Sequence, residues 1–327
     1  MKSIKQCAVI GAGLAGLSCA SALQQAGLAV TVFEKSRGPA GRMSTRRGQD
    51  WQCDHGTQYF TARDPVFRAE VARWQEAGVA DCWTPRLQVF GDGGLRETQS
   101  SVERFVGVPR MTAPAHFLAQ SLNVTPQTTI TAFRHDAAGW QLQSAEHGWL
   151  ASRFDVLALA VPAPQAAPLL AGHAPDLAAL AAATTMRASW ALMLQFPAPL
   201  SLPFDAAFIN EGPLRWVARD SSKPGRSGIE TWLLHATADW SQAHLEQTAE
   251  EVATVLLKAF ADLGAPAPQH WTAHRWRYAD TALPLNQSCA WLPNAGLGLC
   301  GDWLAGGKVE GAWCSGRDLA AQIVSAT

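Results

Sequence analysis

The stretch from Cys7 to Glu34 is the feature that most constrains the fold of this chain. It reads "CAVIGAGLAGLSCASALQQAGLAVTVFE": an apolar run, a glycine turn at residues 11–16, a helical spacing of apolar residues that stops at Gly27, and a β-branched run that ends at Glu34. This order is a strand–helix–strand unit with GxGxxG at its first turn. The stretch therefore predicts a Rossmann-type α/β domain.

Each part of this unit has a physical role in binding a dinucleotide. Gly11 permits the turn, Gly13 lets the backbone approach a pyrophosphate, and Gly16 lets helix and strand pack closely. The helix N-terminus supplies N–H groups and a positive dipole end. Glu34 can accept hydrogen bonds from both ribose hydroxyls. The predicted cofactor-binding residues here are Gly11, Ala12, Gly13, Leu14, Ala15, Gly16, Glu34 and Lys35. The motif alone does not separate NAD from FAD.

Composition excludes several other classes of protein. The chain has 327 residues, 48% of them apolar and 16% charged, with a formal net charge of −1. This length suits two domains, and the charge gives no reason to bind nucleic acid or an anionic membrane. No apolar run is long enough to span a membrane, and the N-terminus lacks a secretory cleavage site. We expect a cytoplasmic monomer. The seven scattered cysteines form no metal-ligand spacing and are expected to be reduced, mostly buried thiols.

The C-terminal stretch "GLCGDWLAGGKVEGAWCSG", residues 298–316, predicts a second half of the same site. It reads as a strand that ends at Gly301 and Asp302, a glycine loop, and a helix that begins between Lys308 and Ala312. The positive end of that helix favours a negative charge. The two chain ends are therefore expected to fold onto one nucleotide, with the middle of the chain as an insertion.

Several stretches resemble FAD flavoproteins of the glutathione-reductase and monoamine-oxidase superfamily. They are "EKSRGPAGR" from residue 34, "DHGTQYF" from residue 54, "DVLALAVPAP" from residue 155, and "GLCGDW". The resemblance implies FAD, with Arg42 at the pyrophosphate, Gly56 beside the isoalloxazine and Asp302 at the ribityl and pyrophosphate region. It also implies that the C-terminal helix points at the flavin N1–C2=O edge. The remaining implied cofactor residues are His55, Val309 and Glu310, with helix capping as a further role for Glu310.

The same reading predicts two domains that alternate along the chain. The FAD-binding domain, with a β-meander, comprises residues 1–60, 105–164 and 273–327. A mainly antiparallel α+β substrate domain comprises residues 61–104 and 165–272. Within it we expect a long helix from Ser241 to Leu263 and a flexible loop at "ARDSSKPGRSG", residues 218–228.

Among the small members of the superfamily, the chain resembles the renalases most. The stretches that carry this likeness are "MSTRRGQDWQCDHGTQYFTARDP", "HRWRYA" and the C-terminal one. The resemblance implies oxidation of the 1,2- and 1,6-dihydro isomers of NAD(P)H to NAD(P)+, with O2 reduced to H2O2. None of the six lysines falls on a substrate-domain strand, where amine oxidases hold a lysine near flavin N5. Hydride transfer from a dihydropyridine needs positioning and no general base, so no catalytic acid–base residue is expected.

Substrate-binding residues are expected on two segments. Thr57, Gln58 and Tyr59 follow Gly56 on the substrate side, and Arg96 and Arg187 are candidates for a substrate pyrophosphate or else ordinary structural arginines. The FAD is expected to be noncovalent, because no cysteine occupies the attachment position and only Cys289 is near it in sequence. Two alternatives stay open: a flavin amine oxidase or desaturase, and a flavin-binding redox sensor without turnover.

Overall fold

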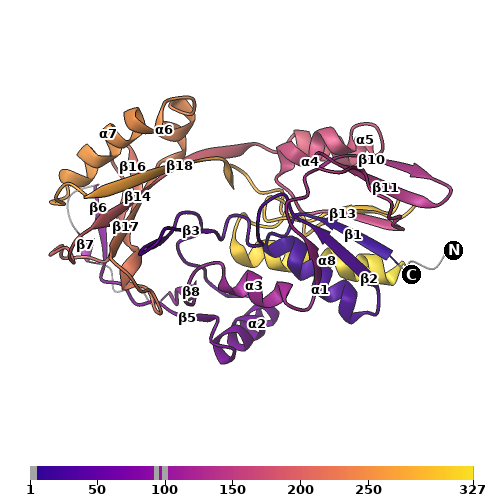
Figure 1. Cartoon of the computed structure of the whole chain (residues 1–327), viewed down its shortest axis with the longest axis horizontal. Helices are drawn as coiled ribbons and strands as arrows, with labels where there is room; N and C mark the ends of the chain where they lie inside the picture. The colour runs from indigo at the N-terminus through magenta and orange to yellow at the C-terminus, as the bar shows by residue number, and fades with distance from the viewer. Residues whose placement is uncertain (1–5, 92–95, 98–101, 327) are drawn as a thin grey trace.

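The computed structural model describes residues 6–91, 96–97 and 102–326. The molecule is elongated and has two lobes, each built on one large β-sheet (Figure 1). Both chain ends lie in the lobe of the six-stranded sheet, at the end of the molecule away from the seven-stranded sheet. The mixed α/β fold with a Rossmann-type lobe is the one that the sequence predicts.

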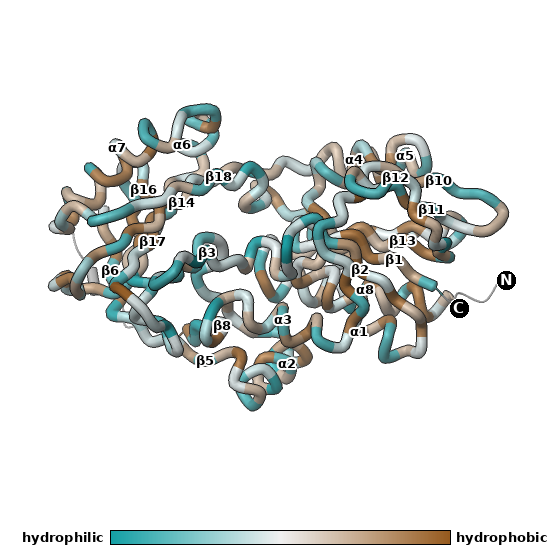
Figure 2. The backbone as a smooth tube through the Cα atoms, in the orientation of Figure 1, coloured by the Kyte–Doolittle hydropathy of each residue, from teal (hydrophilic) through white to brown (hydrophobic). Residues whose placement is uncertain are grey.

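The six-stranded sheet is parallel except for one edge strand. Its order is β19-β20-β13-β1-β2-β9, and only β19 runs antiparallel to its neighbour. β1 and β13 lie in the middle, and because they are covered on both faces they are almost wholly apolar (Figure 2). The bounds are β1 Gln6–Ile10, β2 Ala29–Phe33, β9 Asn123–Thr125, β13 Val156–Leu159, β19 Ala290–Leu292 and β20 Leu297–Leu299.

Helices from both chain ends pack together on one face of this sheet. α1 (Leu14–Gln25) and α8 (Val309–Ser325) approach so closely that a Cβ on Gly316 would lie 2.1 Å from the Ala15 carbonyl oxygen. α3 (Ala113–Ala119) lies beside α1. The other face carries α4 (Ala163–Leu170), α5 (Pro175–Ala182) and the expected meander of β10 (Ile130–Asp136), β11 (Gly139–Ser144) and β12 (Gly148–Trp149). Among the described helices, none is long and apolar enough to cross a bilayer.

The seven-stranded sheet is antiparallel except at one strand pair. Its order is β18-β14-β17-β16-β15-β6-β7, with β15 and β6 parallel. Residues alternate between two faces: Trp232 and Leu234 pack under α7, whereas Leu233 and His235 face the other way. The bounds are β6 Leu87–Phe90, β7 Arg96–Glu97, β14 Met186–Phe196, β15 Ala206–Ile209, β16 Leu214–Arg219, β17 Glu230–Ala236, β18 His270–Thr281, α6 Ala238–Ala243 and α7 Ala249–Ala261.

Smaller elements join the two lobes. β3 (Thr45–Arg47) and β4 (Gln52–Asp54) form a hairpin, and β5 (Ala80–Cys82) pairs with β8 (Phe105–Gly107). α2 (Pro65–Glu76) is capped by Asp64, whose side chain accepts hydrogen bonds from two backbone N–H groups of the first turn. Its apolar face packs into the same core as α1 and α8.

Two local predictions were wrong. The long helix expected from Ser241 to Leu263 is two helices, because the chain breaks after α6 and Thr248 opens α7 with a capping box to Glu251. The segment expected to be a flexible loop holds the end of β16, the 3-10 helix η1 (Asp220–Ser222) and the buried side chain of Lys223.

Two stretches also lie on a different sheet from the one assumed in the domain prediction. β18 is hydrogen-bonded to β14 along the seven-stranded sheet, although residues 273–281 were assigned to the FAD-binding domain. α4 and α5 pack against the six-stranded sheet, although the substrate domain was expected to resume at residue 165.

Candidate functional site

A pocket of about 1600 Å³ lies where the two lobes meet. From the six-stranded lobe it is lined by the ends of β1 and β2, the glycine turn, Gly301 and Asp302, and the start of α8. From the seven-stranded lobe it is lined by residues of β14, β16, β17 and β18. Pockets for one small molecule span roughly 300–1000 Å³, so this one has room for two ligands side by side.

The glycine turn leaves open space at one position only. A Cβ on Gly11, whose φ is +106°, would lie 2.6 Å from the Ala160 carbonyl oxygen, and one on Gly16 would lie 2.0 Å from the Gly11 oxygen. Both glycines are therefore required by packing within the chain. A Cβ on Gly13 would meet no described heavy atom within 4 Å. Gly13 lines the pocket, so its missing side chain leaves space for a ligand.

Two helix N-termini face this pocket without caps. Gly13 is the N-cap of α1 and Lys308 is the N-cap of α8, and among the described residues no side chain caps either helix. Leu14 and Ala15 of α1 and Val309 of α8 line the pocket. Uncapped first turns present free N–H groups and a positive dipole end. The pocket can therefore receive negative charge at two places, as a pyrophosphate and an electron-rich ring require.

Glu34 lies at the end of β2 with only 6% of its surface exposed. Its two carboxylate oxygens accept hydrogen bonds from the Ala12 and Ser36 backbone N–H groups, each at 2.8 Å. A carboxylate has about four lone-pair sites, so it keeps acceptor capacity for two hydroxyls. Glu34 and Lys35 both line the pocket.

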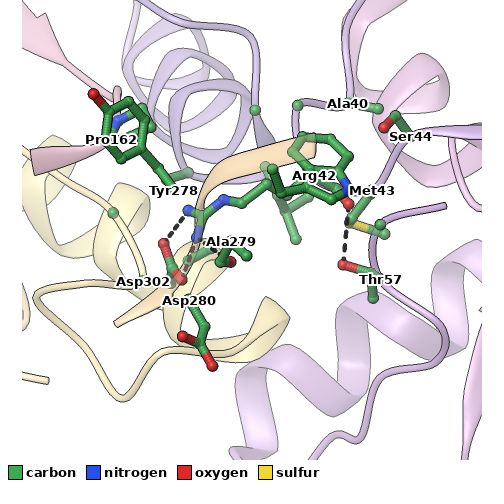
Figure 3. A pocket seen from close by; sticks show the side chains of 18 of the residues that line it. Ala40, Arg42, Met43, Ser44, Thr57, Pro162, Tyr278, Ala279, Asp280 and Asp302 are labelled. Atoms are coloured by element: carbon green, nitrogen blue, oxygen red, sulfur yellow. Dashed lines mark hydrogen bonds and ion pairs between the residues drawn. The ribbon is translucent and has the colours of Figure 1, made fainter. Parts of the chain in front are cut away.

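Arg42 and Asp302 form an ion pair on the wall of the pocket (Figure 3). The Arg42 guanidinium donates to the Ala279 carbonyl oxygen at 3.2 Å and, through both terminal nitrogens, to the Asp302 carboxylate, with Nη1 3.0 Å from Oδ2. The resemblance to FAD flavoproteins implies a separate role for each residue, Arg42 at the pyrophosphate and Asp302 at the ribityl and pyrophosphate region. The structure joins them as one bidentate pair on the pocket wall.

The segment from Asp54 to Tyr59 passes along the pocket. Its backbone lies close to other segments of the same chain. A Cβ on Gly56 would lie 2.0 Å from the Arg42 carbonyl oxygen, which also accepts from the Thr57 N–H at 2.9 Å. The His55 carbonyl oxygen accepts from Trp276 Nε1 at 2.9 Å and lies 3.1 Å from His235 Nε2. Strands of the seven-stranded sheet therefore hold this segment in place. His55, Gly56, Thr57, Gln58 and Tyr59 all line the pocket.

Three histidines on this side of the pocket are held neutral. The His55 ring stacks on Trp276 and meets the His274 ring edge-on at 4.7 Å. Burial, with His274 and Arg46 as smaller causes, lowers the pKa of His55 to about 3. Burial also lowers the pKa of His235 and of His274 to about 4. Near pH 7 these rings offer hydrogen bonds without positive charge.

Some predicted residues lie away from the pocket or have another partner. Ala12, Gly16 and Glu310 are not among its described lining residues. Glu310 Oε1 accepts from the backbone N–H groups of Arg63 and Asp64, so it caps the chain just before α2.

Neither predicted substrate arginine is shown in the pocket. Arg187 forms a two-point pair with Asp280, with both N···O distances 2.9 Å, and does not line the pocket. Arg96 lies in β7, the outermost strand of the seven-stranded sheet, and its side chain falls outside the described part of the structure.

Of the further arginines that line the pocket, three come from β16 and β18 and form what we call the arginine rim: Arg215, Arg275 and Arg277. Arg275 and Arg277 share Glu246, and Arg215 shares Asp280 with Arg187. Over the described lining, eight lysines and arginines face three acids, although the whole chain has a net charge of −1. The alternation in "HRWRY" was the available sequence signal, because it puts two arginines on one face of a strand.

Neither a metal-ligand cluster nor a cysteine in the pocket lining occurs among the described residues. No group of three or more histidine, cysteine, aspartate or glutamate side chains among them could hold a metal ion. No described lining residue is a cysteine, and Cys289 is buried elsewhere. All seven cysteines are free, and all but Cys82 and Cys314 are buried, as the sequence predicts.

The fold and site define a two-lobed protein with a Rossmann-type dinucleotide-binding lobe. A family profile described as an NAD(P)-binding Rossmann-like domain matches residues 9–73. Among solved structures, the chain is similar to an Exiguobacterium protein provisionally described as a protoporphyrinogen oxidase, with a TM-score of 0.79 and 12% identity over 99% of this chain and 100% of that one. It is also similar to cyclohexylamine oxidase from Brevibacterium oxydans, with a TM-score of 0.77 and 14% identity over 99% of both. At these identities the likeness shows a shared fold.

Curated relatives match over shorter stretches. An L-amino-acid oxidase of Crotalus adamanteus is 36% identical over 70 residues, 21% of this chain. A hydroxyneurosporene desaturase of Rubrivivax gelatinosus is 34% identical over 113 residues, 30% of this chain. The chain spans 14% and 21% of the lengths of these two relatives.

Proposed function

We propose that this protein is an FAD-dependent oxidoreductase of the renalase type, which oxidises 1,2- or 1,6-dihydro isomers of NAD(P)H to NAD(P)+ and passes the electrons to O2. The observation that carries the proposal is the pocket itself. It combines a dinucleotide cradle with a second, basic half that suits another phosphorylated ligand. The oxidase and desaturase names among the similar proteins support redox chemistry on this fold.

The two chain ends would share the FAD. Glu34 would hold the adenosine ribose, and the α1 N-terminus at Gly13 would hold the pyrophosphate beside the pair of Arg42 and Asp302. The α8 N-terminus at Val309 would stabilise the negative charge of the reduced ring. When bound, FAD supplies a two-electron acceptor for a hydride, and O2 then takes the electron pair as H2O2.

The charge of the second half of the pocket favours an anionic substrate. The arginine rim borders it, and each acid of the rim is shared between two arginines. A pyrophosphate on the substrate would meet guanidinium groups, which bind phosphate in a two-point geometry. A protonated amine would instead be repelled. This contrast supports a dinucleotide substrate over an amine.

The protein's task in this reaction would be positioning. The dihydropyridine gains aromaticity when its carbon gives up a hydride, so no base is needed to remove a proton. The three histidines are neutral near pH 7, and the described lining lysines, Lys35 and Lys308, belong to the cofactor half of the pocket. Thr57 and Tyr59 line the substrate half beside Gly56 and would orient the nicotinamide.

Anaerobic flavin reduction tests the proposal and its alternatives together. FAD-loaded protein is mixed with the dihydro isomers, with ordinary NADH and with primary amines, and H2O2 is then measured in air. We expect rapid reduction by the isomers only, and release of the flavin by acid precipitation. Faster reduction by amines would favour an amine oxidase. Stable FAD without turnover of any donor would favour a redox sensor.

A further inference from the structure

Four charged side chains are buried together behind the pocket wall and define what we call the buried charge cluster: Asp54, Asp220, Lys223 and Arg226. Asp54 and Asp220 are 0% exposed, and Lys223 is 2% exposed. Lys223 Nζ lies 2.7 Å from Asp220 Oδ1 and 3.1 Å from Asp54 Oδ2, and Arg226 also pairs with Asp54. Buried charges persist only when they are paired and hydrogen-bonded. Here the positive charges of Lys223 and Arg226 offset the negative charges of the two aspartates.

The cluster ties together segments that are distant in the sequence. Asp54 ends β4, whereas the other three members lie in and after η1, more than 160 residues later. Asp54 Oδ1 also accepts from Thr45 Oγ1 and from the Met111 N–H. Burial alone would raise the pKa of Asp54, but Lys223 and Arg226 outweigh it and hold that pKa well below its usual range. Asp54 is therefore an ionised centre on which both lobes converge.

Gln58 connects the cluster to the pocket. Its Oε1 accepts from Lys223 Nζ at 3.3 Å, and its Nε2 donates to the carbonyl oxygens of Asp54 and Gly56 at 2.6 and 3.2 Å. Because Lys223 can only donate, it fixes which way the Gln58 amide points. The amide nitrogen is thereby directed at the backbone on both sides of His55. Lys223 itself does not line the pocket, whereas Gln58 and Gly56 do.

We propose that Lys223 is a positioning residue: acting through Asp54 and Gln58, it holds the backbone of residues 55–57 at the position that sets the alignment of flavin and substrate. The inference rests on the proposed function, because it assigns this segment to the reacting face of the pocket. Lys223 touches neither ligand. Its effect on the reaction passes through two side chains and one stretch of backbone.

A merely structural ion pair would give a different result, and a double variant separates the two cases. Lys223→Met alone leaves an acid unpaired and is expected to destabilise the fold. Adding Asp220→Asn removes that acid, keeps an acceptor for the Asp54 N–H and leaves the pair of Arg226 and Asp54 intact. We therefore expect the double variant to fold but to lack the bond from residue 223 to Gln58.

The matched control is the exposed pair of Lys258 and Asp262 on α7, with an N···O distance of 3.1 Å. Lys258→Met with Asp262→Asn makes the same chemical change far from the pocket. The conservative variant Lys223→Arg keeps a charged donor beside Gln58. It is expected to recover most of the wild-type spectrum and rate.

The test compares three readouts in each FAD-loaded protein: the visible flavin spectrum, the melting temperature, and kcat and KM with the best dihydro isomer. For the double variant we expect a shifted flavin spectrum and a kcat lower by about tenfold or more, with KM changed by less than about threefold. Its melting temperature should stay close to that of the control. A folded double variant with wild-type spectrum and kcat would overturn the inference. A colourless wild-type protein that takes up no FAD would instead overturn the proposed function.

Discussion

Arg42 and Asp302 lie 260 residues apart and form a two-point ion pair on the pocket wall, so the two chain ends are joined where the cofactor would bind. Replacing Arg42 by Met removes a cation and leaves the carboxylate of Asp302 buried without it. We expect the dissociation constant for FAD to rise about tenfold to a hundredfold, since bonds to charged groups contribute roughly 1.5–3 kcal/mol. Fluorescence titration of the apoprotein measures this.

The control for Arg42 is Arg86, which forms a similar two-point pair with Asp205 away from the pocket. Arg86→Met should leave FAD affinity unchanged. If the Arg42 variant and this control bound FAD with equal affinity, Arg42 would not contribute to the cofactor site.

Two glycines of the same turn should respond in opposite ways to alanine. Gly13→Ala adds a methyl group into open pocket space at a backbone φ of −71°, which alanine adopts freely. The apoprotein should keep its melting temperature while FAD affinity falls. Gly16→Ala puts a methyl group 2.0 Å from the Gly11 carbonyl oxygen, so the apoprotein itself should melt several degrees lower. Normal FAD binding by Gly13→Ala would contradict the claim that the dinucleotide lies against Gly13.

Stability should fall with acid across a defined range of pH. The unfolded chain protonates its histidines near pH 6.5, whereas His55, His235 and His274 resist protonation until about pH 3 or 4. Between pH 6.5 and 4 the unfolded state therefore binds more protons, and each such histidine reduces stability by up to about 1.4 kcal/mol per unit of falling pH. Thermal melts at steps of pH check this. His235→Asn should flatten the dependence.

The rate of flavin reduction should behave differently from stability. Because these three rings are already neutral above pH 5, kcat should show no histidine titration between pH 5.5 and 8. A step in kcat near pH 6.5 would mean that one of the rings is charged in the working enzyme.

The arginine rim should set affinity for the substrate through charge. Glu246→Gln frees Arg275 and Arg277, so KM for a dihydro dinucleotide should fall about twofold to fivefold, whereas Arg277→Gln should raise it by a similar factor. Both effects should shrink with added salt, because these side chains are partly exposed. If KM instead rose in Glu246→Gln or fell in Arg277→Gln, or if neither change depended on salt, the substrate phosphates would bind elsewhere.

The glycine turn and the strand-end acid proposed for the cofactor half of this site could be read from the sequence because their constraints are local. A glycine with a positive φ at residue 11, a close helix contact at residue 16 and an acid at the end of β2 are all visible as residue types at fixed spacing. The start of the C-terminal helix between Lys308 and Ala312 was predicted for the same reason. The break before α7 was also visible, as the capping box that begins at Thr248.

The substrate half could not be predicted in the same way because its partners come from distant strands. Alternation showed that the arginines in "HRWRY" share a face of a strand, but not that both are among the residues that line a pocket. Lys223 lies among serine, proline and glycine, a composition typical of exposed loops. Its burial depends on Asp54, more than 160 residues earlier in the chain, and no local sequence pattern indicates that contact.

Anaerobic spectroscopy of the purified protein tests the central claim most directly. The account predicts a yellow protein with bound FAD, whose flavin band bleaches rapidly on mixing with a 1,2- or 1,6-dihydro isomer of NAD(P)H and returns in air with release of H2O2. A protein that is colourless and refuses FAD, or one whose flavin is reduced no faster by these isomers than by ordinary NADH, would contradict it.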